Sequence, residues 1–296
     1  MAEVKKVNRY KKTIKTKNSF SSDNRERKIL TKKKFKPLDD LHRYTLIVYG
    51  EKKIGKTTLL SQFPNTYSFM FEPNDSYELY KDDIIDWQDF LDLVPQFLAG
   101  KHDYESCCID NGRNCYELAL DFVCKRLDIE HPAQQNDYGQ TWAEIYKEFS
   151  TPIKKLMQSQ YGFAVTCHQT EKDIETRTGR TFVQVMPDLS SAAARLFCGE
   201  IYNIFYYHYE GTDRFLQIIG DDYITAGHRM KGHFLTTKGE LIHRIPMGEN
   251  EEEAYENLII AYNNKQKDSC RINRKEKSKT TGSLREKKLK YKNNNL

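Results

Sequence analysis

The sequence lacks the long apolar runs and paired cysteines that are typical of membrane, disulfide-rich or zinc-binding proteins. No run of about 18 apolar residues occurs, so we expect no membrane partner and no spanning helix. The basic N-terminus has no apolar stretch behind it, which argues against a secretory signal. The 7 cysteines form no CxxC pair, which argues against a disulfide framework or a zinc site and predicts a reducing, cytoplasmic environment.

Charge is distributed unevenly, although the net charge of the 296 residues is only +5. Residues 1–40 hold 14 Lys/Arg and 5 Asp/Glu, residues 265–296 hold 12 and 3, and residues 41–264 hold 21 and 34. Polar segments of like charge cannot bury enough surface to fold, so we expect both ends to be disordered. Such ends suit a polyanion such as nucleic acid, although a solvated, lysine-rich terminus has the same composition.

Short apolar runs alternate with helical patterns from Tyr44 onward, which indicates βα units and a parallel sheet. The predicted strands are 45–49, 67–71, 106–110 and 162–167, and the predicted helices are 56–63, 87–98, 114–127, 141–157 and 189–198. Two hairpins follow within 171–187 and 201–219. We therefore predict an α/β fold with a central, mostly parallel sheet and C-terminal antiparallel hairpins. The predicted segments are a basic tail (1–40), one domain (41–248), a C-terminal helix (249–264) and a second basic tail (265–296).

The segment GEKKIGKTT lies between the first predicted strand and helix and matches the phosphate-binding pattern GxxxxGK[ST] in full. Its glycines let the backbone curl so that successive N–H groups point at phosphate oxygens. In such a loop Lys56 reaches the β- and γ-phosphates, and the Thr57 hydroxyl binds Mg²⁺. We therefore expect ATP and Mg²⁺ to bind at Gly50, Glu51, Lys52, Lys53, Ile54, Gly55, Lys56, Thr57 and Thr58.

Two carboxylates stand at the ends of predicted strands. Asp110 ends the strand SCCID, where a Mg²⁺-holding carboxylate is required in this class, although Asp110-Asn111-Gly112 is also a good turn. Glu72 ends the strand before it and could orient and deprotonate an attacking water, or be an exposed acid beside Pro73.

Three further side chains are candidates for the reaction. His168 follows the fourth predicted strand, opposite the γ-phosphate position, where it could sense that phosphate or be a capping or core histidine. Arg229 and Lys231, in GHRMKGH, could stabilise transition-state charge at a neighbouring subunit's site, as arginine fingers do, or form a solvated basic turn.

Taken in order, GEKKIGKTT, FMFEP, SCCIDN, VTCH, a hairpin and GHRMKG resemble the RecA-like ATPases. The closest resemblance is to the phage-encoded AAA-type nucleotide-binding proteins that serve in single-strand annealing and recombination, over residues 44–245. The stretches NDYGQTWAEI and PDLSSAAARLF resemble that group too. The resemblance implies that Glu72 activates water, Asp110 is the Walker B acid and His168 is the sensor. It also implies that Arg229 and Lys231 complete a neighbour's site in a ring or filament. Glu200 departs from the pattern, because an aspartate is common at that place.

Three functions remain open from the sequence. The first is an ATPase of phage DNA recombination, replication or annealing that binds single-stranded DNA, with Tyr206, Tyr207 and Tyr209 as candidates for stacking on bases. The second is a small-molecule kinase, for which Arg177 and Arg180 beside a hairpin turn form only a faint lid, or a GTPase, whose NKxD motif is missed by one residue at 264–268. The third is a scaffold that binds ATP without hydrolysing it.

Overall fold

The computed structural model describes residue 34 and residues 38–270, and divides the chain into residues 1–37 and residues 38–296. We describe the second of these units by itself. Both predicted basic tails lie largely outside the described residues. The predicted division into a domain and a C-terminal helix stays a prediction.

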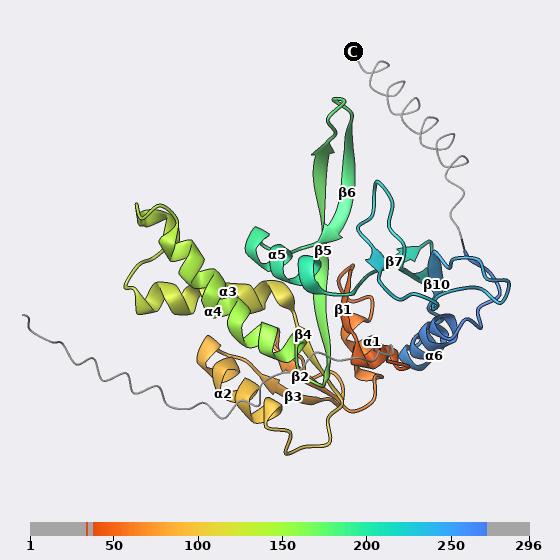
Figure 1. The fold of residues 1–296 in the computed structure, drawn as a ribbon, viewed down its shortest axis with the longest axis horizontal. Coiled ribbons are helices and arrows are strands. Elements are labelled where there is room, and N and C mark those ends of the chain that lie inside the picture. Colours follow the sequence, from red (N-terminus) through yellow and green to blue (C-terminus); the bar gives the residue numbers. More distant parts are fainter. Residues whose placement is uncertain (1–33, 35–37, 271–296) are drawn as a thin grey trace, which may run out of the picture. The chain divides into compact units, whose positions relative to one another are not determined.

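The elements follow the predicted βα order with several additions (Figure 1). The strands are β1 (Thr45–Gly50), β2 (Thr66–Met70), β3 (Tyr80–Asp83), β4 (Ser106–Asp110), β5 (Gly162–Glu175), β6 (Thr181–Pro187), β7 (Asn203–Glu210), β8 (Asp213–Gln217), β9 (Gly227–His228) and β10 (Arg244–Pro246). The helices are α1 (Lys56–Ser61), α2 (Trp87–Leu98), α3 (Gly112–Arg126), α4 (Gln140–Met157), α5 (Ser191–Glu200) and α6 (Glu251–Tyr262), with short 3₁₀ turns at Leu41–Arg43 and Pro132–Gln134.

One sheet runs in the order β10-β8-β7-β1-β5-β4-β2-β3, with β6 paired to β5 and β9 paired to β7. The six strands from β7 to β3 are parallel, whereas β8 and β10 at the other edge are antiparallel. The predicted α/β class, with a mostly parallel sheet and C-terminal antiparallel strands, is confirmed. In this order β5 lies between β1, which carries the phosphate-binding motif, and β4, which carries Asp110.

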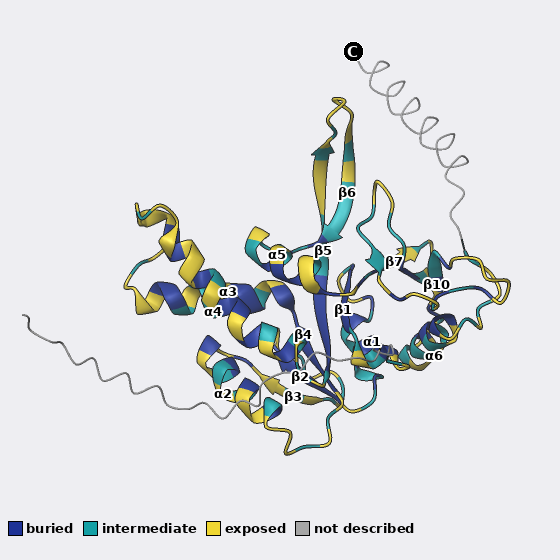
Figure 2. Cartoon of the chain, in the orientation of Figure 1, coloured by how far each residue is buried: buried dark blue, intermediate teal, exposed yellow. Residues whose placement is uncertain are grey.

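Both faces of the sheet are covered, which explains why β1 is apolar throughout. Its residues are all buried: Ile47 and Tyr49 point into the cluster made by α2, α3, α4 and α5, and Leu46 and Val48 point into the cluster made by α1 and α6 (Figure 2). A strand buried on both faces reads as a continuous hydrophobic run rather than an alternating one. Helix α4 packs its predicted stripe against this sheet through Ile145, Phe149, Ile153 and Leu156, which are fully buried, while Trp142 is exposed at its edge.

Strand β5 is longer than predicted, and this corrects the position of His168. The prediction ended the strand at Cys167, but β5 continues to Glu175 as one strand. It pairs with β1 up to His168 and then with β6 from Gln169 onward, so its hydrogen bonding changes partner without a break. The β5–β6 hairpin projects from the sheet, and most of its tip is exposed (Figures 1 and 2).

Two smaller differences have clear local causes. The pattern missed β3 because YKDD is polar and mostly exposed, at the edge of the sheet beside β2. Helix α3 begins two residues earlier than predicted because the Asn111 side chain accepts hydrogen bonds from the backbone N–H groups of Arg113 and Asn114. Asn111 is thus a helix N-cap, and Asp110 precedes a helix rather than an isolated turn.

Candidate functional site

The phosphate-binding motif forms a loop between β1 and α1, as predicted. Gly50 packs so closely against β7 that a Cβ atom there would lie 1.8 Å from the Tyr207 carbonyl oxygen. Gly55 has φ +102°, in the left-handed region that favours glycine, immediately before α1 begins at Lys56. The two glycines are therefore required by a close strand contact and by the turn into the helix.

Lys56 is held under the loop by backbone oxygens. It is 8% exposed, and its Nζ donates to the carbonyls of Glu51 at 2.6 Å and Gly50 at 3.3 Å. Burial lowers the pKa of the Lys56 ammonium, and the charge of Asp110 acts in the opposite direction. The ammonium group is thus pre-positioned and poorly solvated, the state in which an incoming anion interacts with it most strongly.

Asp110 links the phosphate-binding loop to β5 through two hydrogen bonds. Its carboxylate accepts hydrogen bonds from the hydroxyl of Thr57 and from that of Thr166 on β5, the latter at 2.6 Å. Burial raises the pKa of Asp110, and the two hydroxyl hydrogen bonds oppose that rise. The predicted metal-binding pair, Thr57 and Asp110, is therefore in direct contact. Mg²⁺ is usually bound through one or two protein oxygen ligands together with phosphates and water, which this pair fits.

Glu72 and His168 meet beside this pair. The Glu72 Oε2 atom accepts a hydrogen bond from the Asn111 amide at 2.6 Å and lies 3.5 Å from the His168 Nε2 atom. Burial lowers the pKa of His168, and the charge of Lys56 lowers it further, so the imidazole is neutral at neutral pH. Its Nδ1 atom is buried and has no hydrogen-bond partner within the described residues.

One cavity of about 580 Å³ is lined by Lys56, Thr57, Glu72, Asp110 and His168. The segment after β2 covers part of it, where the Asn74 amide donates to the Tyr77 hydroxyl at 3.0 Å. Tyr209 and Arg214 reach it from the β7–β8 hairpin. The full lining is Lys52, Lys53, Ile54, Gly55, Lys56, Thr57, Thr58, Glu72, Pro73, Asn74, Ser76, Tyr77, Asp110, His168, Tyr209 and Arg214.

The structure does not bring Arg229 and Lys231 to this cavity. Both are exposed, and the Arg229 guanidinium lies 5.8 Å from the ring centroid of Tyr202. They follow β9, which pairs with Asn203 and Ile204, whereas the phosphate-binding loop is level with Tyr207 at the other end of β7. Within one chain, Arg229 and Lys231 therefore lie at the opposite end of the parallel strands from the phosphate-binding loop. Their action at a neighbour's site stays a prediction.

Sequence reasoning missed Thr166, Asn111 and Tyr77. Thr166 had a usable signal, because it is a polar residue inside an apolar strand and a buried hydroxyl needs a partner. Asn111 was named only as part of a turn. Tyr77 lies in a polar segment without periodicity, and nothing in its neighbours indicated that it would reach the cavity.

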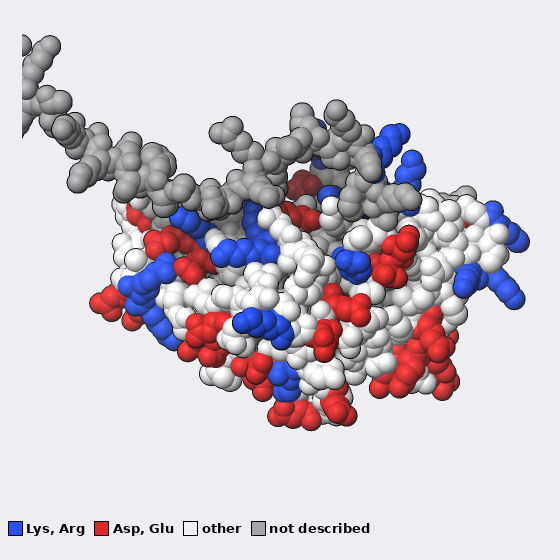
Figure 3. Space-filling view, turned by 60° about the horizontal axis from the view of Figure 1, so that its bottom comes forward, with Lys and Arg blue, Asp and Glu red and all other residues white. Residues whose placement is uncertain are grey.

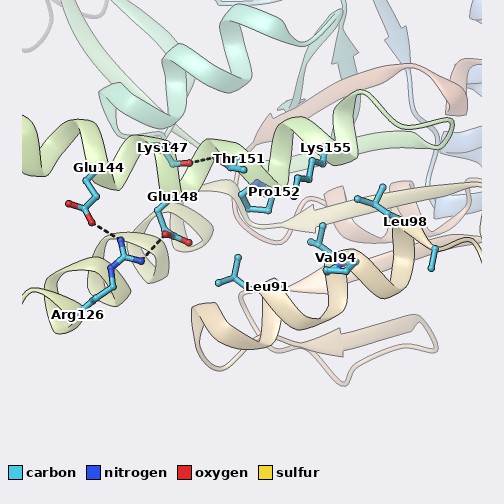
Figure 4. Close-up of a pocket in the computed structure, with 12 residues that line it drawn as sticks. Leu91, Val94, Leu98, Arg126, Glu144, Lys147, Glu148, Thr151, Pro152 and Lys155 are labelled. Carbon is cyan, nitrogen blue, oxygen red and sulfur yellow. Dashed lines mark hydrogen bonds and ion pairs between the residues drawn. The ribbon is translucent and has the colours of Figure 1, made fainter. Parts of the chain in front are cut away.

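A larger cavity of about 740 Å³ lies between α2 and α4 (Figure 4). Leu91, Val94, Leu98 and Pro152 supply its apolar wall. Its main charges neutralise one another, because Arg126 pairs with Glu144 at 2.9 Å and with Glu148 at 3.0 Å. The phosphate-binding loop lines the smaller cavity and not this one, so we place the chemistry in the smaller cavity.

Comparisons with known proteins give one family and two similar structures. The family model described as an AAA domain matches residues 42–231. No curated protein sequence matches the chain. Similar solved structures include a KaiC-like protein from Pyrococcus horikoshii OT3, with a TM-score of 0.40 and 11% identity, covering 71% of this chain and 87% of that one. They also include the RadB recombinase, with a TM-score of 0.38 and 11% identity, covering 71% and 88%.

None of the helices in residues 38–270 is long and apolar enough to cross a bilayer. The match to the family model spans well over half of the chain, including the phosphate-binding loop, Asp110, His168 and the hairpins. This chain therefore belongs to the AAA domain family, and it has an α/β fold with a mostly parallel sheet and a phosphate-binding loop.

Proposed function

We propose that this protein binds and hydrolyses ATP with Mg²⁺, and that it acts on single-stranded DNA in phage recombination, replication or annealing, in the host cytoplasm. The observation that carries the ATPase part is the convergence of Lys56, Thr57 and Asp110 in one cavity beside a phosphate-binding loop. A buried cation, a hydroxyl and a carboxylate at this spacing fit a magnesium-bound triphosphate.

The residues present fit that ligand. Lys56 would hold the β- and γ-phosphates together with the loop amides, and Thr57 and Asp110 would hold Mg²⁺. When bound, Mg²⁺ supplies charge neutralisation to the transferred phosphoryl group. The hydrogen bonds that Thr57 and Thr166 donate to Asp110 fix the carboxylate in place before any ligand arrives.

Glu72 is our candidate general base. Its side chain is about half exposed, so water reaches it, and the Asn111 amide fixes one of its oxygens at 2.6 Å. A positioned carboxylate of this kind typically contributes about 10²–10⁴-fold to a rate. His168, neutral and 3.5 Å from Glu72, would sense the γ-phosphate through the same carboxylate.

The role in DNA metabolism rests on the sequence. Figure 3 shows acidic and basic side chains interspersed over the described part of one face, with a cluster of acidic groups at its lower right and basic groups at its far right. The concentrated positive charge instead lies in residues 1–40 and 265–296. These segments would contact the phosphate backbone, giving a salt-dependent affinity without base specificity. Arg229 and Lys231 would act in a neighbouring subunit of a ring or filament.

The test is ATP turnover with and without single-stranded DNA, with the mass of the protein measured with and without nucleotide. We expect turnover to rise with DNA and the mass to indicate an oligomer. Turnover that depends on a nucleoside or metabolite instead would indicate a kinase. The structure gives that alternative no support, because neither Arg177 nor Arg180 lines the cavity.

A further inference from the structure

The cavity between α2 and α4 is a groove that one face of each helix lines (Figure 4). Its lining residues recur along each helix at the i, i+3, i+4 and i+7 spacing of a single helix face. On α2 they are Leu91, Val94, Pro95 and Leu98, and on α4 they are Glu144, Lys147, Glu148, Thr151, Pro152 and Lys155. The positions on α4 span about 16 Å of helix axis. A third helix of about three turns therefore matches the groove in length, as in helix-in-groove recognition.

The base of the groove is apolar and is only partly covered by this chain. Val94 and Pro152 are buried there, Leu91 and Leu98 are half-buried, and Pro95 is exposed. Figure 4 places Leu91, Val94 and Leu98 of α2 opposite Pro152 of α4. A helix with an apolar stripe would cover these side chains, and removing apolar surface from water is the main favourable term in association.

The unbalanced charge at the rim of the groove is positive. Arg126 engages both glutamates of the groove, at 2.9 Å from Glu144 and 3.0 Å from Glu148. Lys147 and Lys155 are exposed, and their ammonium groups form no ion pair or hydrogen bond with the residues that the structure describes. These lysines lie eight residues apart on α4, which is about 12 Å along its axis. The surplus is local, because the central part of the chain is acidic overall.

We propose that this groove docks an acidic amphipathic helix of another protein. The apolar stripe of that helix packs on Val94 and Pro152, and carboxylates about two turns apart on its flank pair with Lys147 and Lys155. The inference goes beyond the proposed ATPase function, because no residue of the groove lines the phosphate-binding cavity.

The charge of the occupant favours a partner protein over this chain itself. Helix α6 begins with three glutamates, but its apolar residues Ala254, Leu258 and Ala261 are buried in the core, so it cannot offer an apolar stripe to a second copy. Residues 1–40 and 265–296 hold mainly basic side chains, which the two lysines of the groove repel. Neither source combines an exposed apolar stripe with acidic flanks.

The experiment measures the binding of three fluorescent helical peptides of about 15 residues by anisotropy. The acidic peptide has a leucine stripe flanked by glutamates. The basic peptide has lysines in place of the glutamates, and the scrambled peptide has the acidic composition in an order without a stripe. We expect the wild type to bind the acidic peptide at least about 10-fold more tightly than either of the others.

Substitutions in the groove test the location. Lys147→Glu together with Lys155→Glu should weaken binding of the acidic peptide about 10-fold or more and should strengthen binding of the basic one. Thr151→Trp, at an exposed position, fills the groove and should weaken binding of the acidic peptide to a similar degree. Lys238→Glu together with Lys267→Glu makes the same charge change at exposed lysines that line neither cavity, and it should alter the affinity less than about 2-fold. ATP binding, measured in parallel, should stay the same in all of these variants and shows that each is folded.

Several outcomes would overturn the docking site. Equal affinity for the acidic and scrambled peptides would remove the apolar stripe, and tighter binding of the basic peptide would point to the chain's own basic ends. Unchanged affinity in both groove variants would place the peptide elsewhere. Self-association of the wild type that Thr151→Trp abolishes, measured by sedimentation, would make a second copy the occupant. None of these results bears on ATP binding, whose loss in the wild type would refute the ATPase proposal alone.

Discussion

The cavity between α2 and α4 and the cavity at the phosphate-binding loop differ in how they affect charged side chains. In the cavity between α2 and α4, hydrogen bonding to Glu148 raises the pKa of Arg126, so pairing favours the charged form. In the cavity at the phosphate-binding loop, burial opposes charge: it lowers the pKa of Lys56 and His168 and raises that of Asp110. The arginine of the larger cavity is paired with carboxylates. The smaller cavity holds desolvated ionisable groups, which a charged ligand could stabilise. Perturbed ionisation therefore locates the site better than volume does.

The largest expected difference between the two cavities concerns their lysines. Lys56→Ala should weaken ATP binding at least about 100-fold, because it removes the only lysine ammonium that the structure buries beneath the loop. Lys155→Ala, at an exposed lysine lining the other cavity, should change binding less than about 2-fold. Calorimetric titration with ATP measures both. Equal effects of the two substitutions on ATP binding would contradict the assignment of ATP to the phosphate-binding cavity.

In the smaller cavity, measuring both ATP turnover and ATP affinity should distinguish a residue that acts in the reaction from one that only binds. Glu72→Gln keeps the hydrogen-bonding shape beside Asn111 but removes the base, so we expect turnover to fall about 100-fold or more while ATP affinity stays within about 2-fold. Steady-state phosphate release measures the rate. Turnover that survives unchanged would remove Glu72 as the base, and the absence of turnover in the wild type would favour the scaffold alternative.

Removing the hydroxyl of two threonines, one beside each cavity, should reduce the stability of the fold by different amounts. Thr166→Val removes a fully buried hydroxyl that donates to Asp110 at 2.6 Å, and we expect a loss of about 1.5–3 kcal/mol, since a charged acceptor loses a donor. Thr151→Val removes an exposed hydroxyl that donates to the Lys147 carbonyl within α4, with an expected loss under about 0.5 kcal/mol. Urea unfolding curves of both variants give the values. A larger loss in Thr151→Val would contradict the assignment.

Two carboxylates, one lining each cavity, should affect stability in opposite directions. The pKa of Asp110 is raised on folding, so its contribution to stability is lost as pH rises from its unfolded value through the folded one. Asp110→Asn should therefore raise Tm by about 2–4 °C at neutral pH, and the gain should shrink toward pH of about 4. Glu148→Gln weakens a partly buried ion pair with Arg126 and should lower stability by about 0.5–1 kcal/mol. Thermal scans across pH test both, and a lower Tm for Asp110→Asn would refute the sign.

The sequence predicted the parallel core well because strong local signals and tertiary burial agree there. Thr45–Tyr49 is mostly apolar because both faces of β1 are covered, and the loop after it matches the phosphate-binding pattern in full. The phosphate-binding residues, Asp110 and Glu72 were placed at strand ends, and the structure brings them together.

The parts that were missed depend on contacts between distant segments. Thr166 and Asn111 act through partners on other strands, and Tyr77 reaches the cavity from a segment with no periodicity. The predicted end of β5 was wrong because the sequence stops being apolar at His168. The strand continues beyond it by pairing with β6 instead of β1. The local hydrophobic pattern indicates which residues are buried, but it does not indicate that a strand changes its pairing partner.

That exchange makes β5 one continuous strand that joins the site to the projecting hairpin. No loop separates His168 from the hairpin, so no backbone joint absorbs a movement of the histidine. The seven residues from Gln169 to Glu175 extend about 23 Å at the rise of an antiparallel strand. By this geometry, a tilt of about 5° at His168 would carry the tip of the hairpin about 2 Å.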